Sequence, residues 1–338
     1  MCVCENIILL KVKRFFILYI SILLGFSASA QDPSFTQFYS CPLFLGPSFA
    51  GGIAGHRAVA NYRNQWLGVK DAYQTYSLSY DHNFINFHSG LGFSAIRDVA
   101  GTGNLGNTRL GLLYSYDFTP IANWHLRPGL GFYVLQTSID FSKLIFGDQM
   151  YSDPDNLPPS STLPPGNTSI YDIDVASSVL AYSDNMWVGA SWDHMLRPTT
   201  SFYNDQSRLA YKFSVYGGIR KVIRGFLLSK IEESITAAFY YRTQADYHQA
   251  DLGLYWFRAP ISFGVWYRGI PFSKTYPKYD ALAFMVGYKF PQLSFAYSYD
   301  FTISRLGFNS GGSHEISLIY EFKVKTKKRW KPIPCPTF

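Results

Sequence analysis

The residues of this chain that could do chemistry recur in one short motif. A serine, an aromatic residue and an aspartate follow one another at Ser79-Tyr80-Asp81, Ser115-Tyr116-Asp117, Ser191-Trp192-Asp193 and Ser298-Tyr299-Asp300. None of these motifs pairs two carboxylates in the way that acid–base catalysis requires. The chain also lacks the Gly-x-Ser-x-Gly sequence that marks a hydrolase nucleophile. We therefore predict a structural role for the motif and no catalytic residue.

Other patterns that could bind a metal or a cofactor fail on their context. The seven histidines form no His-x-x-x-His pair and have no pair of cysteines beside them, as a zinc site would require. Asp148, Asp153 and Asp155 could bind calcium, but their spacing is not that of an ordered ligand loop. Gly101-Thr102-Gly103-Asn104-Leu105-Gly106 has dinucleotide-binding spacing, yet it joins two predicted strands, whereas that fingerprint must open a helix. We predict no metal and no cofactor.

The elements that must position these residues are predicted to be β-strands with one apolar face. Successive side chains of a strand point to opposite sides, so a strand between lipid and a watery lumen alternates every two residues. One such apolar face consists of Leu110, Leu112, Tyr114, Tyr116 and Phe118. The same alternation appears in 282–290, 293–301 and 315–322. In such strands the aromatic residue of the motif suits the lipid–water boundary, and the aspartate points to the lumen or to water.

About fourteen such strands are predicted, which indicates an all-β fold, a transmembrane antiparallel β-barrel. They run near 57–66, 73–83, 89–98, 108–118, 125–137, 171–182, 187–195, 208–220, 234–244, 249–257, 261–269, 281–290, 293–302 and 314–322. Most short connections alternate with long ones, as periplasmic turns and outer loops do. The proline-rich insertion 138–170 is predicted to be an exposed loop or a lid in the lumen. The stretch 221–233 has no explanation in this scheme.

The two ends of the chain have their own predicted roles. Residues 1–30 form a signal peptide, with Lys11, Lys13 and Arg14 before a short apolar core and a cleavage site near Ala30, which indicates export to the outer membrane. Residues 31–55 are predicted to plug the lumen or to lie on its periplasmic rim, 56–322 to form the barrel, and 323–338 to form a basic periplasmic tail. Such a tail can contact anionic lipid heads, an acidic partner or nucleic acid, or stay solvated.

Two cysteines remain after the signal peptide, Cys41 and Cys335. They lie near opposite ends of the mature chain. A disulfide between them is possible, but two cysteines alone do not establish one.

Five short motifs stand along the mature chain: Gln31-Asp32-Pro33-Ser34-Phe35-Thr36-Gln37-Phe38-Tyr39, Tyr62-Arg63-Asn64-Gln65-Trp66, Asp98-Val99-Ala100-Gly101-Thr102-Gly103, His314-Glu315-Ile316-Ser317-Leu318 and Cys335-Pro336-Thr337-Phe338. Together they resemble the PorP/SprF family of Bacteroidota outer-membrane proteins. The resemblance spans the whole mature chain. Gly46 and Ser48 depart from it, since the family usually has asparagine and alanine there.

The resemblance implies a role in the type IX secretion system, which moves cargo with a C-terminal signal domain across the outer membrane. The implied partners are components of that system, a secreted cargo protein such as a gliding adhesin, and outer-membrane lipid, without nucleic acid. The candidate family-signature or partner-contact residues are Gln37, Tyr62, Arg63, Asn64, Gln65, Trp66, Asp98, Gly101, Glu315, Cys335, Pro336 and Phe338. Arg63, Asn64, Gln65 and the 138–170 insertion are expected on the exposed side that holds cargo, and the tail is expected to dock on motor-linked components in the periplasm.

The sequence is consistent with three classes of function. The first is a secretion-system barrel that acts through protein partners and is not an enzyme. The second is a porin or a hydrophobic-solute channel of the fatty-acid type, which about fourteen strands and an N-terminal plug would also suit. The third is a barrel enzyme with a serine and a histidine on its outer wall, and it has the weakest support.

Overall fold

The structure, a computed structural model, describes residues 32–150, 160, 168–202, 207–224, 232–270, 280–304, 307–322 and 333–335. The predicted signal peptide, Gln31, much of the 138–170 insertion and most of the tail fall outside these residues. Pro33 onward belongs to one compact unit, which is the subject below. Within the described ranges no helix is both long and apolar enough to cross a membrane.

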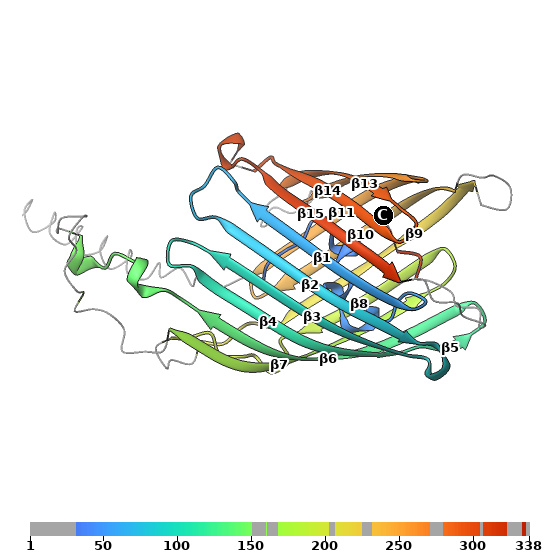
Figure 1. The fold of residues 1–338 in the computed structure, drawn as a ribbon, viewed down its shortest axis with the longest axis horizontal. Helices are drawn as coiled ribbons and strands as arrows, with labels where there is room; N and C mark the ends of the chain where they lie inside the picture. Colours follow the sequence, from blue (N-terminus) through green and yellow to red (C-terminus); the bar gives the residue numbers. More distant parts are fainter. Residues whose placement is uncertain are drawn as a thin grey trace, which may run out of the picture. The chain divides into compact units, whose positions relative to one another are not determined.

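The chain from residue 56 to 322 forms an antiparallel sheet that closes on itself (Figure 1). Its strands are β1 (His56–Gln65), β2 (Tyr73–Phe84), β3 (Ser89–Ala100), β4 (Leu105–Tyr116), β5 (Phe118–Ile121), β6 (Trp124–Ser138), β7 (Ser169–Tyr182), β8 (Met186–Asp193), β9 (Lys212–Arg224), β10 (Glu233–Gln244), β11 (Tyr247–Arg258), β12 (Ile261–Arg268), β13 (Ala281–Lys289), β14 (Leu293–Thr302) and β15 (Ser313–Phe322). Strands that are neighbours in sequence pair with each other, except β4 and β5. The short β5 pairs only with β6, which also pairs with β4, and β1 pairs with β15. The predicted fourteen-strand barrel is therefore confirmed, with β5 as an extra strand.

The strand ends differ from the prediction mainly in β9. This strand begins at Lys212 rather than at 208, and it continues to Arg224. Residues 221–224 of the unexplained stretch therefore extend β9, and they pair with β10 across an irregularity between Glu233 and Ser234. Irregular pairing of this kind is common at barrel rims.

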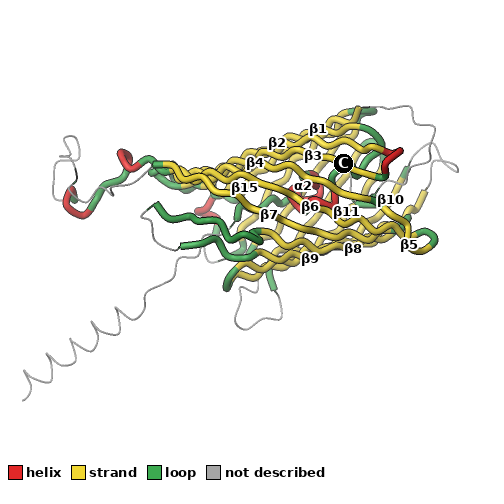
Figure 2. Tube along the Cα trace, turned by 90° about the horizontal axis from the view of Figure 1, so that it is seen from below, coloured by secondary structure: helices red, strands yellow, loops and turns green. Residues whose placement is uncertain are grey.

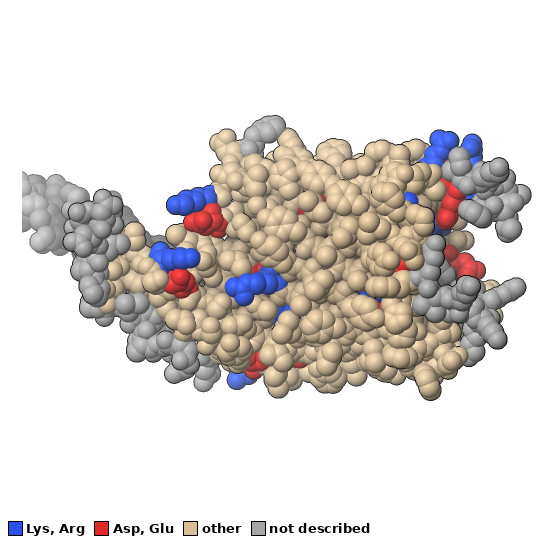
Figure 3. Space-filling model, in the orientation of Figure 1, with Lys and Arg blue, Asp and Glu red and all other residues tan. Residues whose placement is uncertain are grey.

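The two-residue alternation of the sequence becomes the two faces of the wall. In β4, Leu112 is 67% exposed on the outside, whereas Leu113 is 1% exposed toward the lumen. In β15, Ile316, Leu318 and Tyr320 face outward and Glu315 and Ser317 face inward. The wall seen in Figure 3 is mostly uncharged, and many of its charged side chains gather toward the two ends. This is the pattern expected of a wall that faces lipid.

Residues 35–52, which we call the plug, fill the lumen. They contain η1 (Phe38–Ser40), α2 (Pro42–Leu45) and η2 (Pro47–Phe49), and every residue of the plug is buried. Figure 2 shows α2 inside the ring of strands. The short helices η3 (Ile85–Phe87), η4 (Phe141–Lys143), η5 (Gly147–Gln149) and η6 (Phe308–Ser310) lie in the connections between strands. Of the two predicted positions for the N-terminal segment, lumen or rim, the described residues occupy the lumen.

Two wall glycines allow the plug backbone to approach closely. A Cβ atom on Gly90 would lie 2.0 Å from the carbonyl oxygen of Ala50, and one on Gly129 would lie 2.3 Å from the backbone nitrogen of Ser48. Real side-chain atoms do not approach so closely, so these positions need glycine. The wall sequence is therefore shaped to the plug.

The described part of the tail also lies in the lumen. Ile333 and Cys335 are each 8% exposed and belong to the same apolar cluster as Phe38 and Leu43 of the plug. The prediction that the whole tail extends into the periplasm is therefore wrong for residues 333–335. The physical reason is that Ile333 and Cys335 are apolar and find a packed cluster beside the plug.

Candidate functional site

The candidate site is the set of buried polar contacts that hold the plug to the wall. Its centre is Arg63 on β1, which is 1% exposed. The guanidinium Nη2 lies 2.8 Å from Oδ2 of Asp300 on β14, and Nη1 lies 3.1 Å from Oε2 of Glu315 on β15. Nη1 also donates a hydrogen bond to the Thr36 hydroxyl at 2.5 Å. Three neighbouring strands thus converge on one plug residue.

Glu315 binds the plug backbone directly. Its Oε2 accepts a hydrogen bond from the Thr36 N–H at 2.7 Å, and its Oε1 accepts one from the Gln37 N–H at 2.9 Å. The Gln37 side chain donates to the Ser298 hydroxyl and to the Glu315 carbonyl oxygen, both at 3.1 Å. Hydrogen bonds to an ionised carboxylate are roughly twice as strong as neutral ones. We call this cluster of Arg63, Asp300 and Glu315 around Thr36 and Gln37 the Thr36 latch.

Arg268 on β12 extends the Thr36 latch. Its Nη1 lies 3.3 Å from Asp300 Oδ2, and its Nε lies 3.2 Å from Oδ1 of Asp251 on β11. Its Nη2 donates to the Thr36 hydroxyl at 3.2 Å. The hydroxyl of Thr36 in turn donates to the Asp300 carboxylate, at 2.6 Å from Oδ2. The buried charges are therefore paired, which is the condition for tolerating them away from water.

A second latch, the Ala50 latch, holds the other end of the plug. Arg127 on β6 donates from Nη2 to the Ala50 carbonyl oxygen at 2.6 Å and from Nε to the Ser48 carbonyl oxygen at 3.2 Å. Ser115 on β4 donates to the same Ala50 oxygen at 2.7 Å. Asp117, just after β4, lies 3.3 Å from Arg127 and balances its charge.

A third group of contacts, the Gly51 latch, lies next to the second. Asp81 on β2 binds Nε of Arg57 at 2.9 Å and accepts the Gly51 N–H at 2.9 Å. Asn83 donates to the Gly51 carbonyl oxygen at 2.8 Å. The three latches therefore bind both donors and acceptors of the plug backbone. A segment with only short helical turns needs such partners in a closed lumen.

The serine-aromatic-aspartate motif supplies much of this chemistry. Each of its four aspartates faces the lumen and binds an arginine: Asp81 with Arg57, Asp117 with Arg127, Asp193 with Arg109, and Asp300 with Arg63. The prediction that these aspartates point to the lumen is confirmed. Sequence reasoning missed the arginine partners because they come from other strands. The only available signal was that Arg57 and Arg63 share the inward face of β1.

Four of the other predicted residues lie together at the end of β1. Tyr62 faces outward, with its ring 5.0 Å from that of Tyr76. Gln65 ends β1, Asn64 donates to the Tyr62 hydroxyl at 3.4 Å, and the Trp66 ring packs at 5.6 Å from that of Tyr73.

Two further predicted residues lie near the end of β3, and two are outside the part of the chain that the structure describes. Asp98 accepts a hydrogen bond from Thr75 at 2.6 Å inside the lumen, and Gly101 takes the left-handed conformation of a turn at φ +73°. Pro336 and Phe338 lie outside the described residues. Among the predicted residues that the structure describes, Gln37, Arg63 and Glu315 meet in one latch.

The predicted position of Arg63 is wrong. It was expected on the exposed side that holds cargo, but it is buried and bonded inside the lumen. The reason is strand parity, because Asn61 and Arg63 share the inward face of β1 while Tyr62 and Asn64 take the other. A residue near the outer end of a strand is exposed to the outside only if its parity also points outward.

The two cysteines of the described chain are unpaired and buried. Burial raises the pKa of the Cys41 thiol to about 12, and the Cys41 Sγ atom lies 3.3 Å from the Ser77 hydroxyl. Burial likewise raises the pKa of the Cys335 thiol. Both side chains therefore carry protonated, poorly nucleophilic thiols at neutral pH. In the part of the chain that the structure covers, no group of side chains is arranged to hold a metal ion.

The fold and the site together define a transmembrane β-barrel whose lumen is filled by its own N-terminal segment. Residues 27–320 match the family of the type IX secretion system membrane protein PorP/SprF. Because the match covers most of the chain, the protein belongs to this family, and it is a membrane protein of the type IX secretion system in the outer membrane. The family resemblance seen in the sequence motifs is confirmed.

Several solved barrel structures are similar at low sequence identity. The Ralstonia pickettii toluene transporter TbuX has a TM-score of 0.47 and 7% identity, with 84% of this chain and 94% of that chain covered. The Acinetobacter baumannii outer membrane protein Omp33 has a TM-score of 0.43 and 8% identity, with 80% and 100% covered. A KdgM porin has a TM-score of 0.38 and 9% identity, with 79% and 99% covered. A search of curated protein sequences found no match. These similarities carry no argument about function.

Proposed function

We propose that this barrel supports the secretion and surface retention of a specific cargo protein, such as a gliding adhesin, and that it does so without catalysis. The observation that carries this proposal is the filled lumen, in which three latches fix the plug. A barrel closed in this way acts through its rims and outer surface rather than as an open conduit. Membership of the PorP/SprF family supports a protein partner from the same secretion system.

The outer rim offers a surface suited to such a partner. Leu67 and Val69, in the turn between β1 and β2, are 58% and 47% exposed. Ile145 and Met150, in the described part of the 138–170 insertion, are 58% and 72% exposed, and Leu196 after β8 is 47% exposed. Exposed apolar side chains at a polar rim are typical of protein interaction sites. We assign cargo contact to this rim, together with Asn64, Gln65 and Trp66 from the family motif.

The periplasmic end has a different proposed role. Lys323, Lys325, Lys327, Lys328, Arg329 and Lys331 precede the buried residues 333–335. A basic segment anchored at both ends by a strand and by a buried cluster can bind an acidic partner. We assign docking on motor-linked components of the secretion system to this segment.

Co-purification tests the proposal directly. The tagged protein is extracted from outer membranes in detergent, and stoichiometric partners are identified by mass spectrometry. We expect components of the secretion system and one large surface protein. The double variant Leu67→Ser and Val69→Ser should lower recovery of the surface protein and leave the thermal midpoint of the barrel unchanged, because both residues are exposed in a turn.

The outcome also separates the alternatives. Recovery of the barrel alone, with a steady conductance in planar bilayers, would replace our proposal with the porin or hydrophobic-solute channel, which needs the plug to leave the lumen. Lipid turnover that is lost on replacing one outer-wall serine would instead indicate a barrel enzyme.

A further inference from the structure

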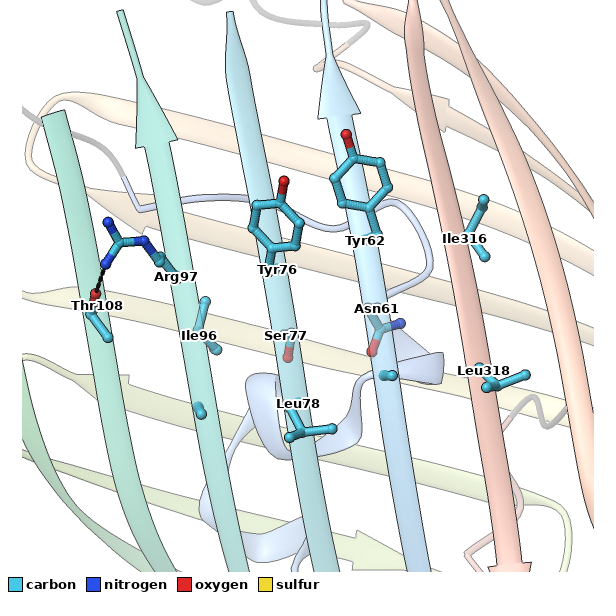
Figure 4. A pocket seen from close by; sticks show the side chains of 12 residues that line it. Asn61, Tyr62, Tyr76, Ser77, Leu78, Ile96, Arg97, Thr108, Ile316 and Leu318 are labelled. Carbon is cyan, nitrogen blue, oxygen red and sulfur yellow. Dashed lines mark hydrogen bonds between the residues drawn. The ribbon is translucent and has the colours of Figure 1, made fainter. Parts of the chain in front are cut away.

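A hollow in the lipid-facing wall lies over strands β15, β1, β2, β3 and β4. It has a volume of about 480 Å³ and is lined mainly by apolar groups (Figure 4). Its floor is low because Ala60 on β1 lies between two large neighbours, Leu78 on β2 and Leu318 on β15. Ala95 on β3 lies on the far side of Leu78, which is itself exposed. Each alanine leaves a low apolar strip in the wall, and the two strips form a trough that Leu78 divides.

A basic side chain stands at the outer end of this hollow. Arg97 on β3 faces outward, is exposed, and lies three residues before the end of the strand at Ala100. Figure 4 shows the Arg97 guanidinium and the hydroxyls of Tyr62 and Tyr76 toward the same end of the hollow. Two other outward basic residues of the strands, Lys221 on β9 and Arg258 on β11, lie at the opposite end of the barrel.

Most N–H donors of the Arg97 guanidinium have no acceptor in the described part of the chain. Its one hydrogen bond runs from Nη1 to the Thr108 hydroxyl at 3.2 Å, and no carboxylate of the described chain pairs with it. An arginine on a lipid-facing wall is unfavourable unless it reaches the interface or meets a counter-charge. Tyr62 accepts a hydrogen bond from Asn64 at 3.4 Å and keeps its own O–H to donate.

We propose that this hollow is a binding site for one anionic, phosphate-bearing lipid of the outer leaflet. One acyl chain lies over Ala60 and the other over Ala95, on the two sides of Leu78. The phosphate accepts hydrogen bonds from Arg97, whose planar fork matches a phosphate oxygen pair. The charge of Arg97 favours a lipid over an uncharged occupant, and the site is independent of the cargo role proposed above.

Native mass spectrometry of the full-length protein in detergent tests this site. The probes are phosphatidylglycerol and a diacylglycerol with the same acyl chains, which lacks the phosphate. We expect the protein to retain one phosphatidylglycerol, and to retain diacylglycerol at least tenfold less. Arg97→Gln should weaken retention of phosphatidylglycerol about tenfold, since it removes the charge but keeps polar hydrogen-bonding groups. Ala60→Leu should lower retention by filling the trough.

Arg258→Gln is the matched control, because it removes an outward arginine at the other end of the barrel. It should leave retention unchanged, and heat-modifiable gel mobility should confirm that each variant is folded. Equal retention of the two probes, or unchanged retention in Arg97→Gln, would overturn the proposal. So would a co-purified membrane protein that is lost in Ala60→Leu while phosphatidylglycerol retention stays the same, since the hollow would then hold a protein.

Discussion

Replacing Glu315 with glutamine should release the plug. The side chains have nearly the same shape, so the wall keeps its packing. The glutamine amide can still accept a hydrogen bond through its oxygen, but its NH₂ group faces a second backbone N–H where the carboxylate had an acceptor. The Thr36 latch therefore loses the charge that binds the Thr36 and Gln37 N–H groups at 2.7 and 2.9 Å. Arg63 keeps Asp300 as its counter-charge.

The magnitude follows from these contacts. A hydrogen bond to a charged group contributes about 1.5–3 kcal/mol, and a buried donor left without an acceptor costs a similar amount. One charge-assisted bond is lost and the other is weakened, so we expect the free energy of plug release to fall by about 3 kcal/mol. Each 1.4 kcal/mol changes an equilibrium constant tenfold, so the released population should rise roughly a hundredfold.

Cys41 reports release directly, because it lies in the plug and is 1% exposed. Burial raises the pKa of its thiol to about 12, so at pH 7 it reacts with a maleimide only when the plug leaves the lumen and the thiol regains its usual pKa. In a Cys335→Ser background, the labelling rate of Glu315→Gln should exceed that of the parent by about a hundredfold in the regime where reclosing is fast.

Asp193→Asn provides the control for this experiment. It makes the same change of a carboxylate to an amide in another lumen aspartate, one that pairs with Arg109 at 3.1 Å. Its labelling rate should stay within a few-fold of the parent. Equal labelling of Glu315→Gln and its parent, with both proteins folded, would show that the latch does not hold the plug.

Three further predictions concern the same closed lumen. Cys335 should resist maleimide at pH 7 in the native wild-type protein and react in urea, because burial raises its thiol pKa. Gly90→Ala should lower the thermal midpoint and speed Cys41 labelling, since its methyl group would lie 2.0 Å from the Ala50 oxygen, whereas Gly147→Ala has nothing within 4 Å and should change neither. The wild-type protein should show no steady conductance in planar bilayers, and an open pore at rest would contradict the closed lumen.

Much of the barrel could be predicted from the sequence because its signals are local. The alternation from Leu110 to Phe118 reports which side chains face lipid, and Leu110, Leu112 and Phe118 are indeed exposed in the structure. Proline and glycine clusters mark the connections, so most predicted strand ends fall close to those observed. The exception is β9, where a basic continuation to Arg224 carried no apolar alternation to follow.

The latches could be predicted only in part. The four motif aspartates were expected to face the lumen, and parity alone is enough for that. Their arginine partners depend on which strands meet across the barrel, and Arg63 pairs with Asp300 and Glu315 over more than two hundred residues of sequence. No local sequence pattern reports a pairing over so long a separation. The expectation that Arg63 is exposed therefore rested on its position along β1 alone.

The sequence is enough to predict a lipid-facing barrel, because strands that alternate every two residues can satisfy their backbone in a membrane only by closing into a barrel. It also carried the family motifs that identify the chain with PorP/SprF. The folded barrel was needed to show that residues 35–52 fill the lumen and that Ile333 and Cys335 pack beside them. The reason is that a plug has no periodicity of its own, and its position depends on charges and glycines contributed by strands distant in sequence.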